Sequence, residues 1–307
     1  MSAVSTARRL ELAWGRTQLV AMQRGVAALA QMRRSHLRDQ HGELDLLVRP
    51  GRDPDATPLV CVHGFGGDKE TWLLLAAAIG RGRGVIALDL PGHGRSSLPD
   101  APVTIALHAE AVRRVMDHCN VARAIVCGNS MGGGVALRLA ANHPERVSAL
   151  VLVSSVGSDV HHHAAVAAWR TGPNPLIPSE HEIDEFIDNS LDGPTLIPRS
   201  VIRYVATSRS RAARKLRRLF EEFAAGHGEE GVPEQLERIL APTLVLHGER
   251  DKIIDRRTAE ALCRRLPRAE LYHLPRVGHA PQLEAPRRTA ALLLDFLRRQ
   301  ARAGALR

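Results

Sequence analysis

Aromatic side chains are scarce in this chain of 307 residues, in which Phe, Trp and Tyr together make up 3%. The hydrophobic core must therefore be built from alanine, leucine and valine. The four cysteines show no C-x-x-C spacing, and two of them lie in predicted core strands; they are Cys61, Cys119, Cys127 and Cys263. We expect reduced thiols in apolar surroundings.

Long hydrophobic runs are absent as well. The first ten residues lack the apolar segment of a secretory signal, and no stretch reaches the ~18 uninterrupted apolar residues that would indicate a membrane-spanning helix. The sequence therefore predicts a cytoplasmic protein that does not span the membrane, so that any membrane attachment is peripheral.

Positive charge exceeds negative charge, with 42 Lys and Arg residues against 33 Asp and Glu residues and a formal net charge of +9. The arginines are spread along the chain, and no helix-turn-helix, zinc-finger or RNA-recognition pattern accompanies them. We therefore expect no nucleic-acid partner. An anionic membrane surface fits the charge better, because of the composition of the N-terminal segment.

That segment, residues 1–43, is predicted to contain one basic amphipathic helix over residues 8–38. Its apolar positions recur at helical spacing, at Leu12, Leu19, Met22, Val26 and Leu29. The basic residues around this stripe are Arg8, Arg9, Arg16, Arg24, Arg33, Arg34 and Arg38. Such a helix, which also carries the amphipathic ring of Trp14, suits the interface of an anionic membrane. Packing on the protein's own core and a dimer contact are the alternatives.

The central motif of the chain is AIVCGNSMGGG, residues 124–134. Four apolar residues predict a buried strand, the run Gly128-Asn129-Ser130-Met131-Gly132 follows, and a helix begins after it. A serine on so sharp a turn presents its hydroxyl at a helix N-terminus, and the flanking glycines let the backbone turn without a Cβ clash. The pattern predicts that Ser130 is a nucleophile.

Strands alternate with helices on both sides of this motif. Further buried apolar runs predict strands at 44–48, 59–62, 85–90, 147–155 and 269–274, and one that begins at 243. Strands that alternate with helices and are buried on both faces indicate a parallel sheet. The predicted fold class is therefore α/β, with a mostly parallel sheet flanked by helices and a core formed by residues 44–155 and 242–307.

Between the two parts of the core, the alternation stops. Residues 156–241 contain helical patterns and no convincing strand, which predicts a helical cap (lid) inserted over the catalytic end of the sheet. Ser179 to Glu182 reads as a capping box at a helix start. The run His161-His162-His163 also lies here, but three consecutive histidines cannot all face one metal on a regular helix, so we expect no metal site.

Two further residues follow Ser130 in the order of a catalytic triad. Asp251 lies in the turn after the strand that begins at 243, and His279 follows the last strand. His279 would take the serine proton while Asp251 fixes the imidazole tautomer. Asp255 is the competing acid. Asp89 and His93 precede the serine, and we interpret them as scaffold.

Taken together, these segments resemble the α/β-hydrolase superfamily from residue 44 to the end. The motifs that carry the resemblance are H-G-F at 63–65, K-E-T-W at 69–72, D-L-P-G-H at 89–93, G-N-S-M-G-G at 128–133, G-E-R-D at 248–251 and G-H at 278–279. The resemblance implies an oxyanion hole made by the backbone N–H groups of Phe65 and Met131, with His63 bracing its loop. It implies no metal and no organic cofactor.

Three shorter motifs narrow the resemblance. N-P-L-I-P-S at 174–179, R-K-L at 214–216 and E-A-P-R-R-T-A at 284–290 are similar to membrane-associated monoacylglycerol lipases. The similarity implies hydrolysis of a single-chain acyl glycerol, with the cap lining an acyl tunnel. An arginine-rich helix stands here in place of that family's apolar anchor, which favours peripheral attachment.

The sequence thus predicts a serine carboxylic-ester hydrolase of monoacyl lipids that works through an acyl-Ser130 intermediate. One alternative is a carbon–carbon bond hydrolase of meta-cleavage products, which G-N-S-M-G-G also resembles. The G-P-G run and the tryptophan typical of those enzymes are replaced by Gly66-Gly67-Asp68 and Ala280. The other alternative is an inactive hydrolase fold that serves as a binding protein, against which the intact triad argues.

Overall fold

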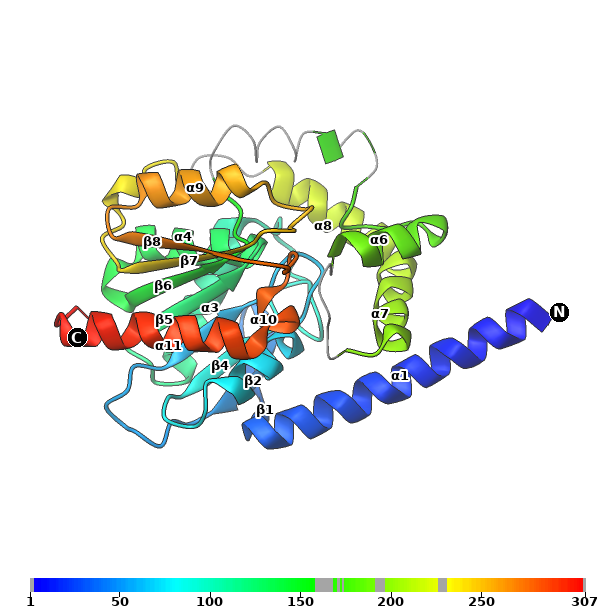
Figure 1. Cartoon of the computed structure of the whole chain (residues 1–307), viewed down its shortest axis with the longest axis horizontal. Coiled ribbons are helices and arrows are strands. Elements are labelled where there is room, and N and C mark those ends of the chain that lie inside the picture. The colour runs from blue at the N-terminus through cyan, green and yellow to red at the C-terminus, as the bar shows by residue number, and fades with distance from the viewer. Residues whose placement is uncertain are drawn as a thin grey trace.

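A computed structural model describes residues 3–157, 168–169, 172, 174–190, 197–225 and 231–305. At its centre lies an eight-stranded sheet with strand order β1-β2-β4-β3-β5-β6-β7-β8 (Figure 1). The strands are β1 (Arg33–Asp39), β2 (Gly42–Arg49), β3 (Leu59–Val62), β4 (Val85–Leu88), β5 (Ala124–Asn129), β6 (Val147–Val153), β7 (Thr243–Gly248) and β8 (Ala269–Leu274). β2 pairs antiparallel with β1 and with β4, whereas β3 to β8 run parallel. This confirms the predicted mostly parallel α/β sheet.

Side chains of the central strands alternate between two hydrophobic cores, one on each face of the sheet. In β3, Val60 and Val62 belong to the first core, and Leu59 and Cys61 belong to the second. The first core is covered by α3 (Ile105–His118), α4 (Met131–Asn142) and α9 (Arg256–Arg265), and the second by α2 (Leu73–Ala78) and α11 (Pro286–Arg302). Burial on both faces explains why the strands read as unbroken apolar runs.

Between β6 and β7, the described residues form helices and no strand. These are α6 (Ile183–Ser190), α7 (Arg199–Arg211), α8 (Ala213–Ala225) and the short 3₁₀ turns η3 (Glu180–Glu182) and η5 (Leu236–Arg238). The capping box between Ser179 and Glu182 is present. The His161-His162-His163 run, where we expect no metal site, lies outside the described residues. That residues 156–241 act together as a cap stays a prediction.

The predicted N-terminal helix over residues 8–38 is wrong after residue 30, over about its last quarter. The helix α1 (Ala3–Ala30) ends before Gln31, whose φ of 55° breaks it, and Arg33 begins a strand. The reason is tertiary: every residue of β1 pairs with a residue of β2 in an antiparallel hairpin, and Leu37 is buried in the first core. The described part of this segment is therefore a helix, Ala3–Ala30, followed by an edge strand of the sheet, Arg33–Asp39.

The helix α1 runs along one side of the molecule, and its N-terminal end projects beyond α7 (Figure 1). Its C-terminal end packs next to α2, where Ala30, the last residue of the helix, is buried in the second core. Met32, just after the helix, is buried in the same core. Among the described residues, no helix combines the length and the apolar composition that crossing a membrane requires.

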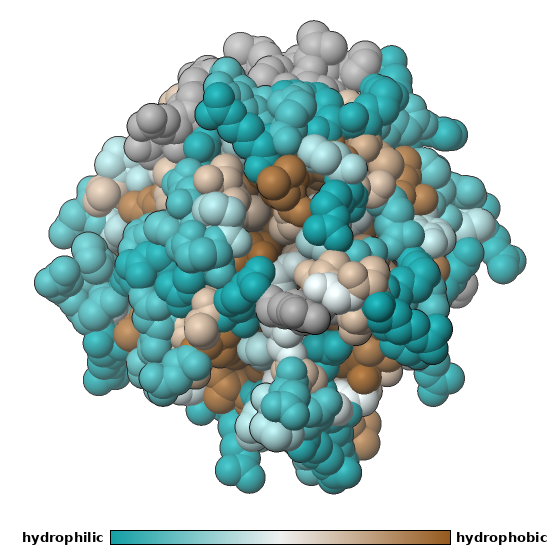
Figure 2. Space-filling view, turned by 90° about the vertical axis from the view of Figure 1, so that its left-hand side faces the viewer, coloured by the Kyte–Doolittle hydropathy of each residue, from teal (hydrophilic) through white to brown (hydrophobic). Residues whose placement is uncertain are grey.

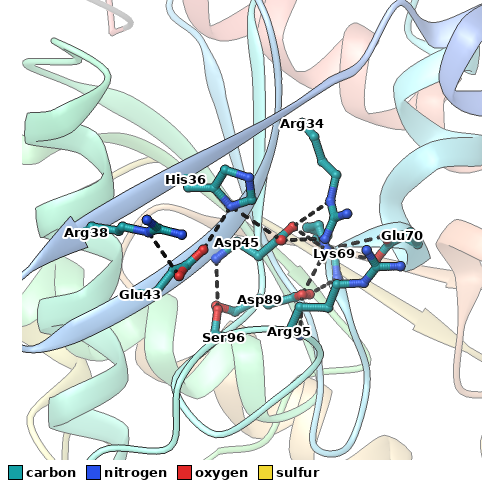
Figure 3. Close-up of polar contacts among 10 residues, drawn as sticks. All are labelled: Arg34, His36, Arg38, Glu43, Asp45, Lys69, Glu70, Asp89, Arg95 and Ser96. Carbon is teal, nitrogen blue, oxygen red and sulfur yellow. Dashed lines mark hydrogen bonds and ion pairs between the residues drawn. The ribbon is translucent and has the colours of Figure 1, made fainter.

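A buried cluster of charges ties β2 to the turn after β4 (Figure 3). Lys69, in the 3₁₀ turn η1 (Lys69–Trp72), is fully buried, and its Nζ lies 2.8 Å from Asp45 Oδ1 and 2.8 Å from Asp89 Oδ2. Burial lowers the pKa of a lysine, but Asp89, Glu70 and Asp45 outweigh this and raise the pKa of Lys69 above its ordinary value. Asp89 thus has the scaffold role inferred from its position in the sequence.

Replacing the buried lysine tests this cluster. We expect Lys69→Met to lower the free energy of unfolding by about 3–5 kcal/mol, because the buried carboxylates of Asp45 and Asp89 lose the ammonium group that lies between them. The control is Arg38→Met, whose ion pair with Glu43 is exposed and is worth about 1 kcal/mol or less. Urea unfolding at neutral pH measures both free energies, and equal losses in the two variants would show that the buried cluster contributes no more than the exposed ion pair.

Candidate active site

Ser130 lies between the end of β5 and the start of α4. Its φ of 55° and ψ of −122° form a conformation that costs a non-glycine residue about 1–3 kcal/mol. Backbone hydrogen bonds hold it there: the Ser130 N–H donates to Val153 O (3.0 Å), and the Ser130 carbonyl accepts from Gly133 N (2.9 Å) and Val156 N (3.1 Å). The surrounding strands thus impose the sharp turn that the sequence motif predicts.

The glycines on either side of Ser130 allow α4 to approach the sheet. A Cβ on Gly128 would lie 2.1 Å from Gly132 O, and a Cβ on Gly132 would lie 2.2 Å from Val62 O. Both positions therefore exclude a side chain.

The structure brings Asp251 and His279 together at the carboxyl ends of the strands. His279 Nδ1 donates to Asp251 Oδ2 at 2.9 Å, while Asp251 Oδ1 accepts from the N–H groups of Ile253 (2.8 Å) and Ile254 (3.0 Å). Burial raises the pKa of Asp251, but the charge and hydrogen bond of His279 outweigh it and lower that pKa below its ordinary value. An ionised Asp251 fixes the tautomer that leaves Nε2 free to accept a proton.

The competing acid, Asp255, has a different place. It is the N-cap of α9, where its Oδ1 accepts from Arg257 N (2.8 Å) and its carboxylate pairs with the Arg257 guanidinium. The structure therefore pairs His279 with Asp251.

Glu284 holds the loop that carries the histidine, a contact that the sequence analysis missed. Its two carboxylate oxygens accept from Gly278 N (2.8 Å) and Ala280 N (2.9 Å), the amides on either side of His279. Glu284 belongs to the short helix α10 (Pro281–Glu284). The only sequence signal was its place at the start of the motif E-A-P-R-R-T-A.

The loop after β3 carries Phe65, the first of the two predicted oxyanion donors. His63 Nε2 accepts from Leu90 N (3.0 Å), so its Nδ1 carries the proton and donates to Gly64 O at 2.7 Å. Burial lowers the pKa of His63, which agrees with a neutral ring. Since Gly64 O and Phe65 N share one peptide plane, His63 braces the donor amide.

The second predicted donor, Met131 N, lies in the first turn of α4. In the described part of the chain, no hydrogen bond engages either Phe65 N or Met131 N. Ser130 and His279 line one cavity, and no direct hydrogen bond joins their side chains; such bonds often tighten only when substrate binds.

That cavity has a volume of about 260 Å³. Ser130, His279 and the Phe65 loop form its base, and most of the wall is apolar. The apolar wall residues from the segment between β6 and β7 are Leu176, Phe186, Ile197, Val201, Ile202 and Val205, and Arg209 of the same segment also lines the cavity. Ile253 and Leu283 complete it on the side of the histidine.

The N-terminal helix also contributes to the wall, through Leu19 and Met22. It crosses α7 closely: a Cβ on Gly15 would lie 2.4 Å from Ser200 O, and Ser200 Oγ donates to Gln18 Oε1. The apolar stripe predicted from Leu12 to Val26 thus packs on the chain itself, one of the alternatives left open above. Leu29, assigned to the same stripe, is instead 72% exposed.

The described residues contain no cluster of three or more histidine, cysteine or acidic side chains that could hold a metal ion. Asp89 and His93 lie away from the cavity wall and are buried.

Comparison with known proteins agrees with this geometry. The sequence profile of the alpha/beta hydrolase family matches residues 59–292. The chain is 35% identical over 252 residues to the dihydrolipoyllysine-residue acetyltransferase component of the acetoin cleaving system of Pseudomonas putida; the match covers 79% of this chain but 64% of that protein's length. It is 27% identical over 286 residues to the monoacylglycerol lipase ABHD6 of Homo sapiens, covering 87% of this chain and 82% of the lipase.

Solved structures of hydrolases also superimpose on this fold. A crystal structure of a membrane phospholipase A described as a bacterial virulence factor superimposes with a TM-score of 0.83 at 28% identity, covering 96% of this chain and 95% of that one. The 2-hydroxy-6-oxo-6-phenylhexa-2,4-dienoate hydrolase of Rhodococcus sp. strain RHA1 superimposes with a TM-score of 0.73 at 27% identity. The superposition covers 87% of this chain and 99% of that one. The protein therefore belongs to the α/β-hydrolase family.

Proposed function

We propose that this protein is a serine hydrolase that cleaves carboxylic esters of monoacyl lipids, foremost monoacylglycerols. The observation that carries the proposal is that Ser130, on a strained turn, shares an apolar cavity with the Asp251–His279 pair. The similarity to a monoacylglycerol lipase over most of both chains supports the substrate class.

The reaction follows from the positions of these groups. His279 Nε2 takes the Ser130 proton as the serine oxygen attacks the ester carbonyl, and Asp251 stabilises the imidazolium. The N–H groups of Phe65 and Met131 stabilise the oxyanion, each by roughly 3 kcal/mol. His279 then protonates the leaving alcohol, and water, deprotonated by the same histidine, releases the fatty acid from acyl-Ser130.

The size of the cavity favours a substrate with one acyl chain. A volume of about 260 Å³ is slightly below the roughly 300–1,000 Å³ of most small-molecule sites. The wall of leucine, isoleucine, valine and phenylalanine offers few hydrogen-bond partners, which suits a hydrocarbon chain. Residues 156–241 act as the cap, because this segment supplies six apolar wall residues, among them Phe186 of α6 and Val201, Ile202 and Val205 of α7.

The outward face of α1 is the proposed contact with an anionic membrane. Leu10 and Trp14, one turn apart, are 67% and 61% exposed, and Arg9, Arg16 and Arg24 are exposed on the same helix. By contrast, hydrophilic side chains cover most of the face on the left of Figure 1, where apolar residues lie between them in small groups (Figure 2). The inward face of the same helix lines the cavity, so membrane contact would lie beside the substrate site.

The first test is the nucleophile. Ser130→Ala is expected to reduce ester turnover by about 10⁶-fold while leaving the melting temperature near that of the parent, because alanine fits the same backbone. Initial rates on p-nitrophenyl esters of rising chain length and on 1-monoacylglycerol measure this. Substantial residual hydrolysis would overturn the assignment.

The same assay separates the second candidate function. The similarity to the Rhodococcus dienoate hydrolase favours carbon–carbon bond cleavage by the same three residues. Turnover of a meta-cleavage dienoate without turnover of monoacylglycerol would establish that candidate. Absence of both activities and of labelling by a fluorophosphonate would indicate a binding protein.

The acid is tested with a matched pair. Asp251→Asn should lower kcat by about 10⁴-fold, since an amide no longer enforces the productive histidine tautomer. Asp255→Asn should leave kcat within about twofold, because that side chain caps α9 and is not bonded to His279. Loss of activity in Asp255→Asn alone would reverse the assignment.

The membrane contact is tested by point changes. Removing the helix would open the cavity that Leu19 and Met22 line, so deletion would alter catalysis as well. We expect Leu10→Glu with Trp14→Glu to weaken co-sedimentation with phosphatidylglycerol vesicles at least about tenfold, because two apolar side chains no longer enter the interface. Hydrolysis of a short soluble ester should not change.

Leu240→Glu is the control for each single change, Leu10→Glu and Trp14→Glu, since it places the same charge on a leucine that is 65% exposed elsewhere. Vesicle binding that is equal in all variants would exclude α1 as the contact.

A further inference from the structure

Arg209, in the last turn of α7, reaches from the proposed cap to the loop after β3 that carries Phe65, here called the oxyanion loop. Its Nη1 donates to Gly66 O (2.9 Å) and its Nη2 donates to Phe65 O (3.1 Å). The same guanidinium donates to Leu176 O, at 3.2 Å from Nε and 2.8 Å from Nη2. One side chain therefore joins three carbonyls from two segments that are far apart in the sequence.

The surroundings of the guanidinium fit it closely. It lies over the Phe186 ring, 5.2 Å from the centroid. Burial lowers the pKa of Arg209 and the nearby Asp68 offsets only part of this, which leaves the pKa at about 10, so the group stays charged at neutral pH. A lysine has one compact ammonium and cannot make the same fork of hydrogen bonds.

The loop itself is shaped around this arginine. Gly66 has a φ of +65°, and a Cβ placed on it would lie 2.5 Å from Arg209 Nη2. The glycine thus gives the guanidinium access to the carbonyls of the loop. The sequence alone gave no reason to connect residue 66 with residue 209.

These contacts control the direction of one amide. His63 holds Gly64 O, which shares a peptide plane with Phe65 N, and Arg209 holds Phe65 O in the next plane. With both planes fixed, the backbone of Phe65 cannot rotate, and its N–H keeps one direction.

We propose that Arg209 is a positioning residue for the oxyanion hole, which orients the Phe65 amide only while α7 is docked against the loop. The inference rests on the proposed serine-hydrolase function. Arg209 does not touch the reacting atoms; it acts through the Phe65 peptide. Transition-state stabilisation then depends on the position of the cap.

The test compares Arg209→Met and Arg209→Lys with the parent protein, and uses Arg211→Met as a control. Arg211 is an exposed arginine on the same helix. We expect kcat for a p-nitrophenyl ester to fall at least about 10-fold in both Arg209 variants, less than the 10²–10³-fold for a donor that is lost altogether, with KM nearly unchanged.

A second readout isolates the oxyanion. A trifluoromethyl ketone forms a tetrahedral adduct with the serine, so its inhibition constant should rise in parallel with the fall in kcat. Binding of a non-reactive ether analogue, which develops no oxyanion, should stay the same. A purely structural arginine would weaken both ligands together.

A third variant distinguishes loss of the guanidinium group from misfolding. In Arg209→Ala, low-millimolar guanidinium chloride should restore part of kcat by occupying the vacated site, whereas the same concentration should not stimulate Arg211→Met. Melting temperatures show whether each variant is folded.

The outcomes are distinct. Unchanged kcat and unchanged ketone inhibition in folded Arg209 variants would overturn the inference, and so would a rise in KM alone, which would make Arg209 part of the acyl wall. If the parent protein itself hydrolyses no ester, the proposed function fails instead.

Discussion

The backbone conformation of Ser130 is the constraint on which the rest of the site depends. A serine with positive φ between β5 and α4 is stable only because its carbonyl and amide are bonded to the neighbouring backbone and because Gly128 and Gly132 admit α4 against the sheet. The parallel strands then bring Asp251 and His279 to the same edge, since the carboxyl ends of parallel strands all lie there.

Around the serine, the site is held by hydrogen bonds to backbone groups. Glu284 fixes the amides on both sides of His279, and His63 fixes the peptide that carries the Phe65 N–H. Arg209, from α7, fixes the next peptide. Such bonds set the directions of N–H groups and rings before a substrate arrives, which is the preorganisation that electrostatic catalysis requires.

Two helices link this site to the surface. The inward face of α1 lines the cavity beside α7, and its outward face carries exposed Leu10 and Trp14. At its far end, α7 carries Arg209. The crossing helices α1 and α7 therefore both line the cavity. In addition, α1 carries the exposed apolar side chains, and α7 contacts the oxyanion loop.

The sequence by itself determined the sheet apart from β1, the elbow and the order of the three residues Ser130, Asp251 and His279, because apolar periodicity, glycine spacing and chain order are local signals. Only the tertiary structure decided where α1 ends and what it covers, since pairing of β1 with β2 overrides the helical pattern after Ala30. It also decided the partners of Glu284 and Arg209. A charged side chain that bonds to backbone groups outside its own helix leaves no periodic trace in its segment, and for Arg209 the loop lies 143 residues away.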